Sequence, residues 1–185
     1  SRDVFSVQQL SGKDRQYLKR LAQDTYRCLD FYREDSNSMP FDNSKSSSEP
    51  FTSVTNIGLY MASLAAACEM GFEDPASASA KLEKLLRSLQ KLPKWKGFPY
   101  DWNHVRNLSP NPEKFVSTVD LGNFYAGLIV ARQYFPKLKN ECDALLEEAN
   151  WKYLYDFRKN LLYGGYDDQK ESYTSWHYDQ LGSEA

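Results

Sequence analysis

The sequence is organised around residues 98–123, which read FPYDWNHVRNLSPNPEKFVSTVDLGN. Prolines in this stretch remove backbone donors and favour extended conformations in the residues before them, so its first part is expected to be an irregular loop. Its last part is expected to begin a helix, because Ser117 followed by Asp120 gives the S-x-x-D pattern of a capping box. A long loop with aromatic and charged side chains on a helical scaffold is typical of a binding or catalytic site.

Helical periodicity is found on both sides of this loop. The pattern predicts helices over residues 11–34, 55–70, 75–92, 119–135 and 137–158. A sixth helix is predicted to begin near Thr174 or Ser175. No strand pattern is found, so the predicted fold class is all-α. Short links on one side and long aromatic loops on the other indicate an array of α/α hairpins, as in a partial or half (α/α)6 toroid.

The domain organisation is interpreted as a single all-α domain over residues 1–185. Residues 35–53, DSNSMPFDNSKSSSEPFTS, are rich in Ser, Asp and Asn, which predicts an exposed loop at the rim of the domain. The sixth helix has hardly begun at Ala185, so the array is expected to be open. The chain is therefore expected to be the N-terminal portion of a larger domain, with the missing C-terminal half as its partner.

Composition and charge exclude several classes of partner. The net charge of −2 gives no electrostatic support for a nucleic-acid partner. No apolar run approaches the roughly 20 residues of a membrane span. No C-x-x-C spacing occurs and each histidine stands alone, so neither a metal site nor a cofactor is predicted. The aromatic fraction of 15% indicates either a large core or a cleft whose rings stack on sugar faces.

Four motifs carry a family resemblance: FTSVTNIGLY at residues 51–60, WKGFPYDW at 95–102, VSTVDLGN at 116–123, and YDQLGSEA at 178–185. In the same order, they resemble the TSPTNIGLYL, W-x-G-H-F-Y-N-W, VSTVDSGN and YYDLLASEA segments of the glycoamylase-like (glucoamylase-like) bacterial proteins. That family is related to β-1,2-glucan-degrading endoglucanases and to a domain of cyclic β-1,2-glucan synthases. A domain of unknown function shares the first three motifs.

The resemblance implies an (α/α) toroid with a sugar-binding cleft at the loop end, and hydrolysis or transfer of a glycosidic bond. Such chemistry uses two carboxyl groups, one as an acid and one as a base or nucleophile. The candidate catalytic residues are Glu184, Asp101 and Asp120, with Glu184 as the expected proton donor because it lies in the S-E-A motif. The family commonly has Asn at the place of Asp101 and often has Asp at the place of His104. The family resemblance also implies a periplasmic or secreted location.

Candidate substrate-binding residues come from the same loops and from the C-terminal part of the chain. They are Thr52, Asn56, Tyr100, Trp102, His104, Arg106, Asn123, Tyr166 and Tyr173. Some of these residues also have a structural explanation, because Asp120, Thr52 and Asn56 can each serve as ordinary helix-capping residues. The aromatic residues can stack on a glucose ring or pack in the core.

Two functional classes stay open. The first is a glycoside hydrolase-like domain that acts on a β-glucan, with β-1,2 linkage favoured, through acid/base carboxylate chemistry. The second is a non-catalytic carbohydrate-binding or scaffolding module. A helical repeat for protein interaction is weaker, because no internal sequence period is visible. Two carboxyl groups about 5 to 9.5 Å apart that face a cleft would indicate an enzyme.

Overall fold

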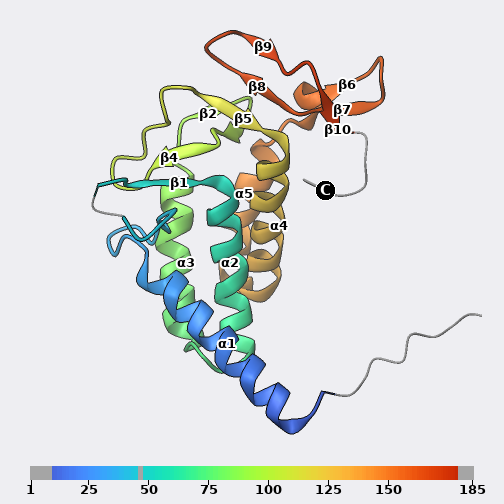
Figure 1. Ribbon diagram of the computed structural model, residues 1–185. Helices are drawn as coiled ribbons and strands as arrows, with labels where there is room; N and C mark the ends of the chain where they lie inside the picture. Colours follow the sequence, from blue (N-terminus) through green and yellow to red (C-terminus); the bar gives the residue numbers. More distant parts are fainter. Residues whose placement is uncertain (1–9, 46–47, 179–185) are drawn as a thin grey trace, which may run out of the picture.

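The computed structural model describes residues 10–45 and 48–178 of the chain. These residues form five α-helices. Their bounds are α1 (Gly12–Phe31), α2 (Val54–Glu69), α3 (Pro75–Leu89), α4 (Thr118–Tyr134) and α5 (Lys139–Glu148). Of these, α2 to α5 lie side by side while α1 runs obliquely across them (Figure 1). α2 and α4 run in one direction and α3 and α5 in the other, with short links at one end and long connections at the opposite end. This alternation of short and long connections is the predicted hairpin array.

The long connections contain short strands that gather at one end of the helices (Figure 1). The described strands are β1 (Phe51–Ser53), β2 (Lys94–Trp95), β3 (Phe98–Pro99), β4 (Trp102–His104), β5 (Phe115–Ser117), β6 (Tyr155–Asp156), β7 (Leu161–Tyr163), β8 (Gly165–Asp167), β9 (Ser172–Tyr173) and β10 (His177–Tyr178). They pair in small antiparallel sheets, β1–β4, β2–β3, β5–β8–β9 and β6–β7–β10. The all-α prediction is therefore correct for the scaffold and wrong for the loop end. Strands of two or three residues are too short to show the alternation that identifies a strand in a sequence.

The start of each of the first four helices follows from its capping residue. Ser11 and Asp14 form a complete capping box at α1. Ser53 and Ser117 accept hydrogen bonds from amides in the first turns of α2 and α4, and Asp74 does the same at α3. These four positions agree with the predicted helix starts within the usual uncertainty of helix ends.

The closest packing of the fold is between α2 and α4. A Cβ atom on Gly127 would overlap the backbone of Gly58, and a Cβ atom on Gly58 would overlap the backbone around Asn123. The two helix backbones are therefore in direct contact, which only glycine at both positions allows. The contact fixes the first turn of α2 beside the first turn of α4, and this places the polar residues of both turns next to each other.

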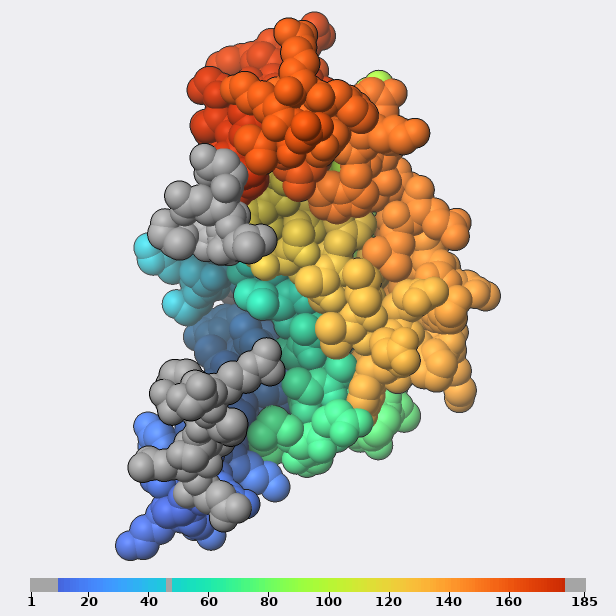
Figure 2. Space-filling view, turned by 90° about the vertical axis from the view of Figure 1, so that its right-hand side faces the viewer, coloured from blue at the N-terminus to red at the C-terminus, as the bar shows by residue number. Residues whose placement is uncertain are grey.

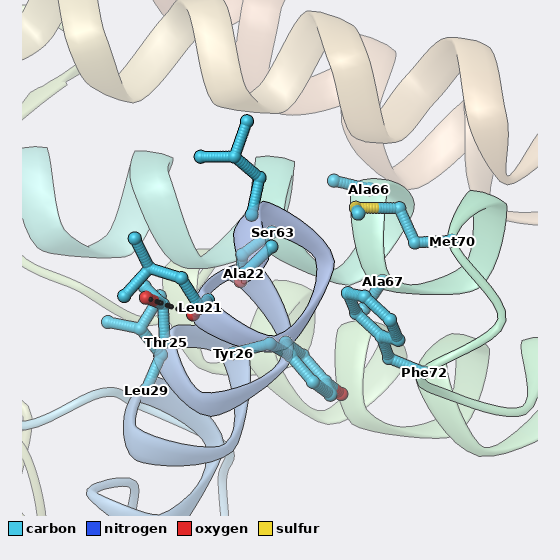
Figure 3. A pocket seen from close by; sticks show the side chains of 11 residues that line it. Leu21, Ala22, Thr25, Tyr26, Leu29, Ser63, Ala66, Ala67, Met70 and Phe72 are labelled. Atoms are coloured by element: carbon cyan, nitrogen blue, oxygen red, sulfur yellow. Dashed lines mark hydrogen bonds between the residues drawn. The ribbon is translucent and has the colours of Figure 1, made fainter. Parts of the chain in front are cut away.

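Helix α1 is less buried than the apolar residues along one side of it would suggest. Of its residues only Tyr26 is buried. Leu18, Leu21 and Leu29 line an open groove of about 410 Å³ together with side chains of α2, such as Ala66 and Met70. Figure 3 shows this groove, with Phe72 closing one end of it.

A polar cluster holds α1 to α2 and α3. The Lys81 ammonium group lies 2.9 Å from Asp30 Oδ2 and 2.8 Å from Glu73 Oε2. Tyr26 donates to Glu73 at 2.5 Å, and Tyr60 donates to Asp30 at 2.9 Å. One cation from α3 thus joins carboxylates from α1 and from the turn before α3, and we call these residues the α1 cluster.

The predicted fifth helix is too long. α5 ends at Glu148, and the chain continues as a 3-10 turn (Trp151–Leu154) and then as β6. The Asn150 amide donates to the Lys96 carbonyl, and the Trp151 ring lies 5.1 Å from the ring of Phe98. These contacts with the neighbouring loop replace the hydrogen bonds that a longer helix would form.

The predicted sixth helix is wrong within the described residues. The sequence near Thr174 belongs to a hairpin in which β9 pairs with β8, and β10 pairs with β7. The Thr174 hydroxyl group accepts from the Gly165 amide and donates to the Trp176 carbonyl instead of capping a helix. Thr and Ser favour turns as well as helix starts, so the sequence signal was ambiguous.

The segment 35–53 is only partly the exposed loop that was predicted. Ser38 and Met39 are fully buried, and the segment ends as β1. Asn37 anchors it, because its side chain donates to the Val105 carbonyl at 2.7 Å and accepts from the Met39 amide. Between these two anchored ends, residues 42, 44 and 45 are exposed.

Both central helices keep one side open to solvent. Figure 2 shows this face, with α2 (teal) and α4 (yellow) at the surface beneath the strands (orange and red). Leu59 on α2 and Ile129 and Val130 on α4 are among the exposed large apolar residues. Helices with apolar residues on all sides are normally buried, so this open face is unusual for a soluble scaffold.

Candidate functional site

Two strand–helix units with similar sequences form the centre of the candidate site. β1 leads into α2 with FTSVTNIG at residues 51–58, and β5 leads into α4 with FVSTVDLG at residues 115–122. In both units the Ser that ends the strand caps the helix. Because α2 and α4 run in the same direction and touch near their first turns, the positive ends of two helix dipoles lie close together.

Asp101 joins the two units. Its backbone amide donates to the Phe115 carbonyl at 2.8 Å, and its carbonyl accepts from the Val54 amide at 2.9 Å. Its Oδ1 atom is buried and has no hydrogen-bond partner among the described residues. Burial and, second, the negative charge of Asp120 raise the pKa of Asp101 to about 7. A carboxyl group with this pKa keeps its proton in a large fraction of the molecules at neutral pH and can act as an acid.

Asp120 is held by hydroxyl groups from both units. Thr55 donates to its Oδ1 atom at 2.6 Å, and Ser117 donates to its Oδ2 atom. Asn123 in turn donates to the Thr55 hydroxyl group at 3.2 Å. The predicted capping box is therefore only half formed, because Ser117 caps the helix but the Asp120 carboxylate bonds hydroxyl groups rather than the Ser117 amide. Asp120 connects α4 to α2 at the place where Asp101 is buried.

Two predicted binding residues on the first unit differ in their surroundings. Thr52 is fully buried, and its hydroxyl group contacts the Ser53 carbonyl at 3.3 Å. The structure therefore places Thr52 in the interior and not on a ligand-binding surface. Asn56 lies in the first turn of α2. Its side chain donates to Asp42 Oδ1 at 2.8 Å and so ties the segment around Asp42 to the helix.

The predicted residues of the 98–107 loop face different directions. Tyr100 is almost fully buried and donates to Asp168 at 2.6 Å. The Trp102 side chain lines a polar hollow at the surface. His104 accepts two backbone amide hydrogen bonds through Nδ1, and Arg106 pairs with Glu34 at 3.0 Å. His104 thus stabilises its own turn, and Arg106 ties that turn to the segment after α1.

The aromatic residues near the C-terminal hairpins form a cluster of their own. Tyr166 stacks on Trp95 with a ring distance of 4.0 Å, and Tyr173 stacks on Tyr163 at 4.3 Å. Tyr173 retains 39% exposure, whereas Tyr166 is half-buried. Glu184 lies outside the described residues. The structure therefore brings together Asp101, Asp120 and Asn123, whereas Tyr166 and Tyr173 make their ring contacts with Trp95 and Tyr163.

Sequence reasoning missed several partners of these residues. Thr55 holds Asp120, Asp42 holds Asn56, and Asp168 holds Tyr100. The repeated F-x-S-x-x-[N/D]-x-G pattern could have shown that the two strand–helix units are alike, but Thr55 occupies a variable position in it. Among residues 10–45 and 48–178, no group of His, Cys, Asp and Glu side chains could hold a metal ion. No helix of these residues is both long and apolar enough to cross a membrane.

The fold is shared with solved glucanases and glucoamylase-like proteins. A β-1,2-glucanase from Parabacteroides distasonis superimposes with a TM-score of 0.76 at 17% identity, over 85% of this chain and 24% of that chain. A putative glucoamylase from Bacteroides caccae gives 0.73 at 14% identity, over 84% of this chain and 42% of that chain. An endo-β-1,2-glucanase from Chitinophaga pinensis gives 0.70 at 16% identity, over 84% and 41%. At these identities the likeness shows the fold alone.

Residues 30–185 match the family described as a protein of unknown function (DUF3131), and the chain belongs to that family. Over 117 residues the chain is 31% identical to the cyclic β-(1,2)-glucan synthase NdvB of Rhizobium meliloti (strain 1021). This match covers 60% of the chain and 4% of the synthase, so the chain spans only a small part of this relative. The resemblance to glucoamylase-like and β-1,2-glucan proteins that the four motifs indicated is confirmed.

Proposed function

We propose that this domain binds a glucan, with β-1,2-linked chains favoured, at the first turns of α2 and α4 and cleaves or transfers a glycosidic bond there. The observation that carries this proposal is the pairing of Asp101 and Asp120. Asp101 is half-buried with a pKa of about 7, and the negative charge of Asp120 contributes to that value. Two carboxyl groups in different protonation states are the requirement of glycosidic bond cleavage.

The two residues have different roles in this proposal. Asp101 donates its proton to the leaving oxygen of the glycosidic bond, and Asp120 acts on the opposite side as the base or nucleophile. Thr55 and Asn123 position the Asp120 carboxylate through their hydrogen bonds. The positive ends of α2 and α4 stabilise the negative charge of Asp120 while the sugar gains positive charge. Glu184, the proton donor predicted from the S-E-A motif, remains a second candidate for the acid.

The test is the release of reducing ends from linear β-1,2-glucan, with β-1,3- and β-1,4-glucans as linkage controls. Asp101→Asn is expected to lower the rate about 10²- to 10⁴-fold and to leave glucan binding intact, because the amide cannot donate the proton. Glu184→Gln is measured in parallel. If Asp101→Asn keeps full activity and Glu184→Gln loses it, Asp101 is not the acid. If the protein neither binds nor cleaves any of these glucans, the proposal is overturned.

Non-catalytic carbohydrate binding is the second candidate function. It is favoured by the full engagement of Asp120, because each of its carboxylate oxygens accepts a hydroxyl hydrogen bond, as a purely structural carboxylate would. The expected result for this function is binding of the same glucan by isothermal titration calorimetry without release of reducing ends. Both candidate functions share the ligand and the site.

A partner and a location belong to the same proposal. The open apolar sides of α2 and α4, with Leu59 and Ile129 exposed, support a further half of the domain as the partner that covers them. The proposed location, periplasmic or secreted, rests on the family resemblance.

A further inference from the structure

A polar hollow of about 310 Å³ lies beside the candidate site. It opens between residues 42–43 and 49–51 on one side and the loop that follows β4 on the other. It is lined by Asp42, Asn43, Glu49, Phe51, Trp102, Asn111 and Glu113. Its volume lies near the lower limit of roughly 300 to 1,000 Å³ for small-molecule sites, which suits a ligand of about one ring.

Trp102, which lines this hollow, differs from the other three tryptophans in its ring contacts. The other three tryptophans pack on rings, with Trp95 at 4.0 Å from Tyr166, Trp151 at 5.1 Å from Phe98, and Trp176 at 5.3 Å from Tyr178. Trp102 makes no ring contact of this kind in the described part of the chain. Its strand explains this, because β4 directs the Asn103 side chain into the interior, and successive side chains of a strand point to opposite faces. The half-buried Trp102 ring is therefore left to line the hollow.

The remaining lining groups are carboxylates and amides. The Asn43 side chain donates to Glu49 at 3.4 Å, and the Asn111 amide fixes the loop by donating to the Trp102 carbonyl at 2.8 Å. Within the described residues no hydrogen bond engages the side chain of Asn111 or of Glu113. Carboxylates accept hydrogen bonds from hydroxyl groups, and amides both donate and accept. Three carboxylates disfavour an anionic ligand, so the chemistry suits a neutral ligand with many hydroxyl groups and one apolar face.

The hollow is linked to the carboxylate pair through hydrogen bonds of the first turn of α2. Asp42 lines it and accepts from Asn56 on α2, and the neighbouring residue Thr55 donates to Asp120. Trp102 follows Asp101 directly in the sequence. A sugar chain bound beside Asp101 and Asp120 would therefore reach the hollow with a neighbouring residue.

We propose that this hollow is a flanking monosaccharide subsite, in which Trp102 stacks on the apolar face of one glucose unit while Asn111 and Glu113 bind its hydroxyl groups. The inference rests on the proposed glucan-binding function, and it adds a position that binds the chain without taking part in bond cleavage.

Calorimetric titration with linear β-1,2-glucooligosaccharides of increasing length tests this subsite. Trp102→Ala is expected to remove the gain in affinity, about tenfold, that one additional glucose unit gives the wild-type protein. The affinity for the shortest oligosaccharide that binds is expected to stay unchanged. Trp102→Phe is expected to retain part of the gain, because a smaller ring still stacks. Asn111→Ala and Glu113→Gln are each expected to reduce this gain in affinity by a smaller factor than Trp102→Ala does.

Trp176→Ala is the matched control, because Trp176 is 50% exposed and lies on the C-terminal hairpin outside the hollow. It is expected to bind every oligosaccharide like the wild type. If Trp102→Ala keeps the full length dependence while its thermal unfolding is unchanged, the subsite is overturned and the proposed function stands. If no glucan binds the wild-type protein, the proposed function is overturned and the subsite with it. A variant that fails to fold is replaced in this comparison by Trp102→Phe together with Glu113→Gln.

Discussion

The chain contains two clusters of partly buried carboxylates, and they differ in what surrounds them. In the α1 cluster, burial raises the pKa of Asp30, but hydrogen bonds from Lys81, Tyr60 and Arg33 and the Lys81 charge together lower it below its usual value. Glu73 behaves in the same way, and its pKa falls to about 2. At the loop end, burial raises the pKa of Asp101 to about 7, and no cation pairs with it among the described residues.

This difference separates a structural cluster from a candidate reactive one. A buried carboxylate with a cation and several donors contributes to stability, whereas one without such partners lowers stability in its charged form. Carboxyl groups of the second kind are typical of functional sites. Removing the shared cation from the first cluster and the carboxylate charge from the second should therefore change stability in opposite directions.

The largest effect is expected from Lys81→Met in the α1 cluster. This change leaves the carboxylates of Asp30 and Glu73 without their shared cation, so the free energy of unfolding is expected to fall by about 2 to 4 kcal/mol. Urea denaturation at pH 7 measures it. Lys84→Met on the exposed side of α3 is the control, since among the described residues the Lys84 ammonium group donates only to the Asp35 carbonyl, and its effect is expected to stay below about 0.5 kcal/mol. Equal losses in the two variants would show that the α1 cluster does not stabilise the fold.

The second effect is a gain in stability from Asp101→Asn. The folded pKa of Asp101 is raised above its unfolded value, so wild-type stability falls as the pH rises from about 4 to about 7. Above that window the neutral Asn side chain removes the cost of the buried charge. The variant is expected to be more stable than the wild type by about 2 to 3 kcal/mol at pH 8 and equally stable near pH 3.

Asp24→Asn on the exposed part of α1 is the matched control for this prediction, because it removes the same charge where the carboxylate faces solvent and lies 3.8 Å from Arg27. Its stability is expected to follow the wild type across the whole pH range. A loss of stability in Asp101→Asn at pH 8 would mean that Asp101 is charged and well solvated at that pH, and the contrast between the clusters would disappear.

Glu73→Gln is expected to show the opposite pH dependence with a smaller magnitude. The folded pKa of about 2 lies below the usual value of 4.5, so the contribution of Glu73 is complete above pH 4.5 and is lost as the pH falls towards 2. The variant is expected to be less stable at pH 7 by about 1 to 2 kcal/mol, given partial solvent exposure, and equal to the wild type near pH 2. Thermal unfolding across this range measures it. A constant difference at every pH would assign the loss to packing instead of charge.

The sequence predicted the elements that carry these clusters better than it predicted their surroundings. Helix starts at Ser11, Ser53 and Ser117 follow from local hydrogen bonding, which is encoded within four residues. The proximity of Asp120 to α2 depends on the Gly58–Gly127 contact between helices far apart in the sequence, and this contact has no local signature. Candidate residues could therefore be named from motifs, but their partners could not.

The surroundings of the individual candidate residues could not be predicted for a similar physical reason. Thr52 and Trp102 both occur in aromatic and polar segments, and only the alternation of side chains along strands β1 and β4 decides which one is buried. His104 was open to a binding role by residue type, but its Nδ1 atom accepts amides of its own turn. Strands of two or three residues show no periodic pattern. The sequence therefore could not predict which of their side chains point to the interior and which point to the surface.

The smallest effect is expected from Thr55→Val, which tests the donors of the loop-end carboxylates. Thr55 donates to Asp120 at 2.6 Å, and Val has nearly the same shape without the hydroxyl group. Because this donor is neutral, its loss is expected to lower the free energy of unfolding by about 1 kcal/mol, less than the loss of the Lys81 cation. Thr25→Val, which removes a hydroxyl bond to the Leu21 carbonyl on exposed α1, is expected to change stability by less than about 0.5 kcal/mol. A loss as large as that of Lys81→Met would show that Asp120 depends on Thr55 as strongly as Asp30 depends on a cation. Asp120 would then belong with the structural carboxylates of the α1 cluster, and Asp101 alone would distinguish the loop end.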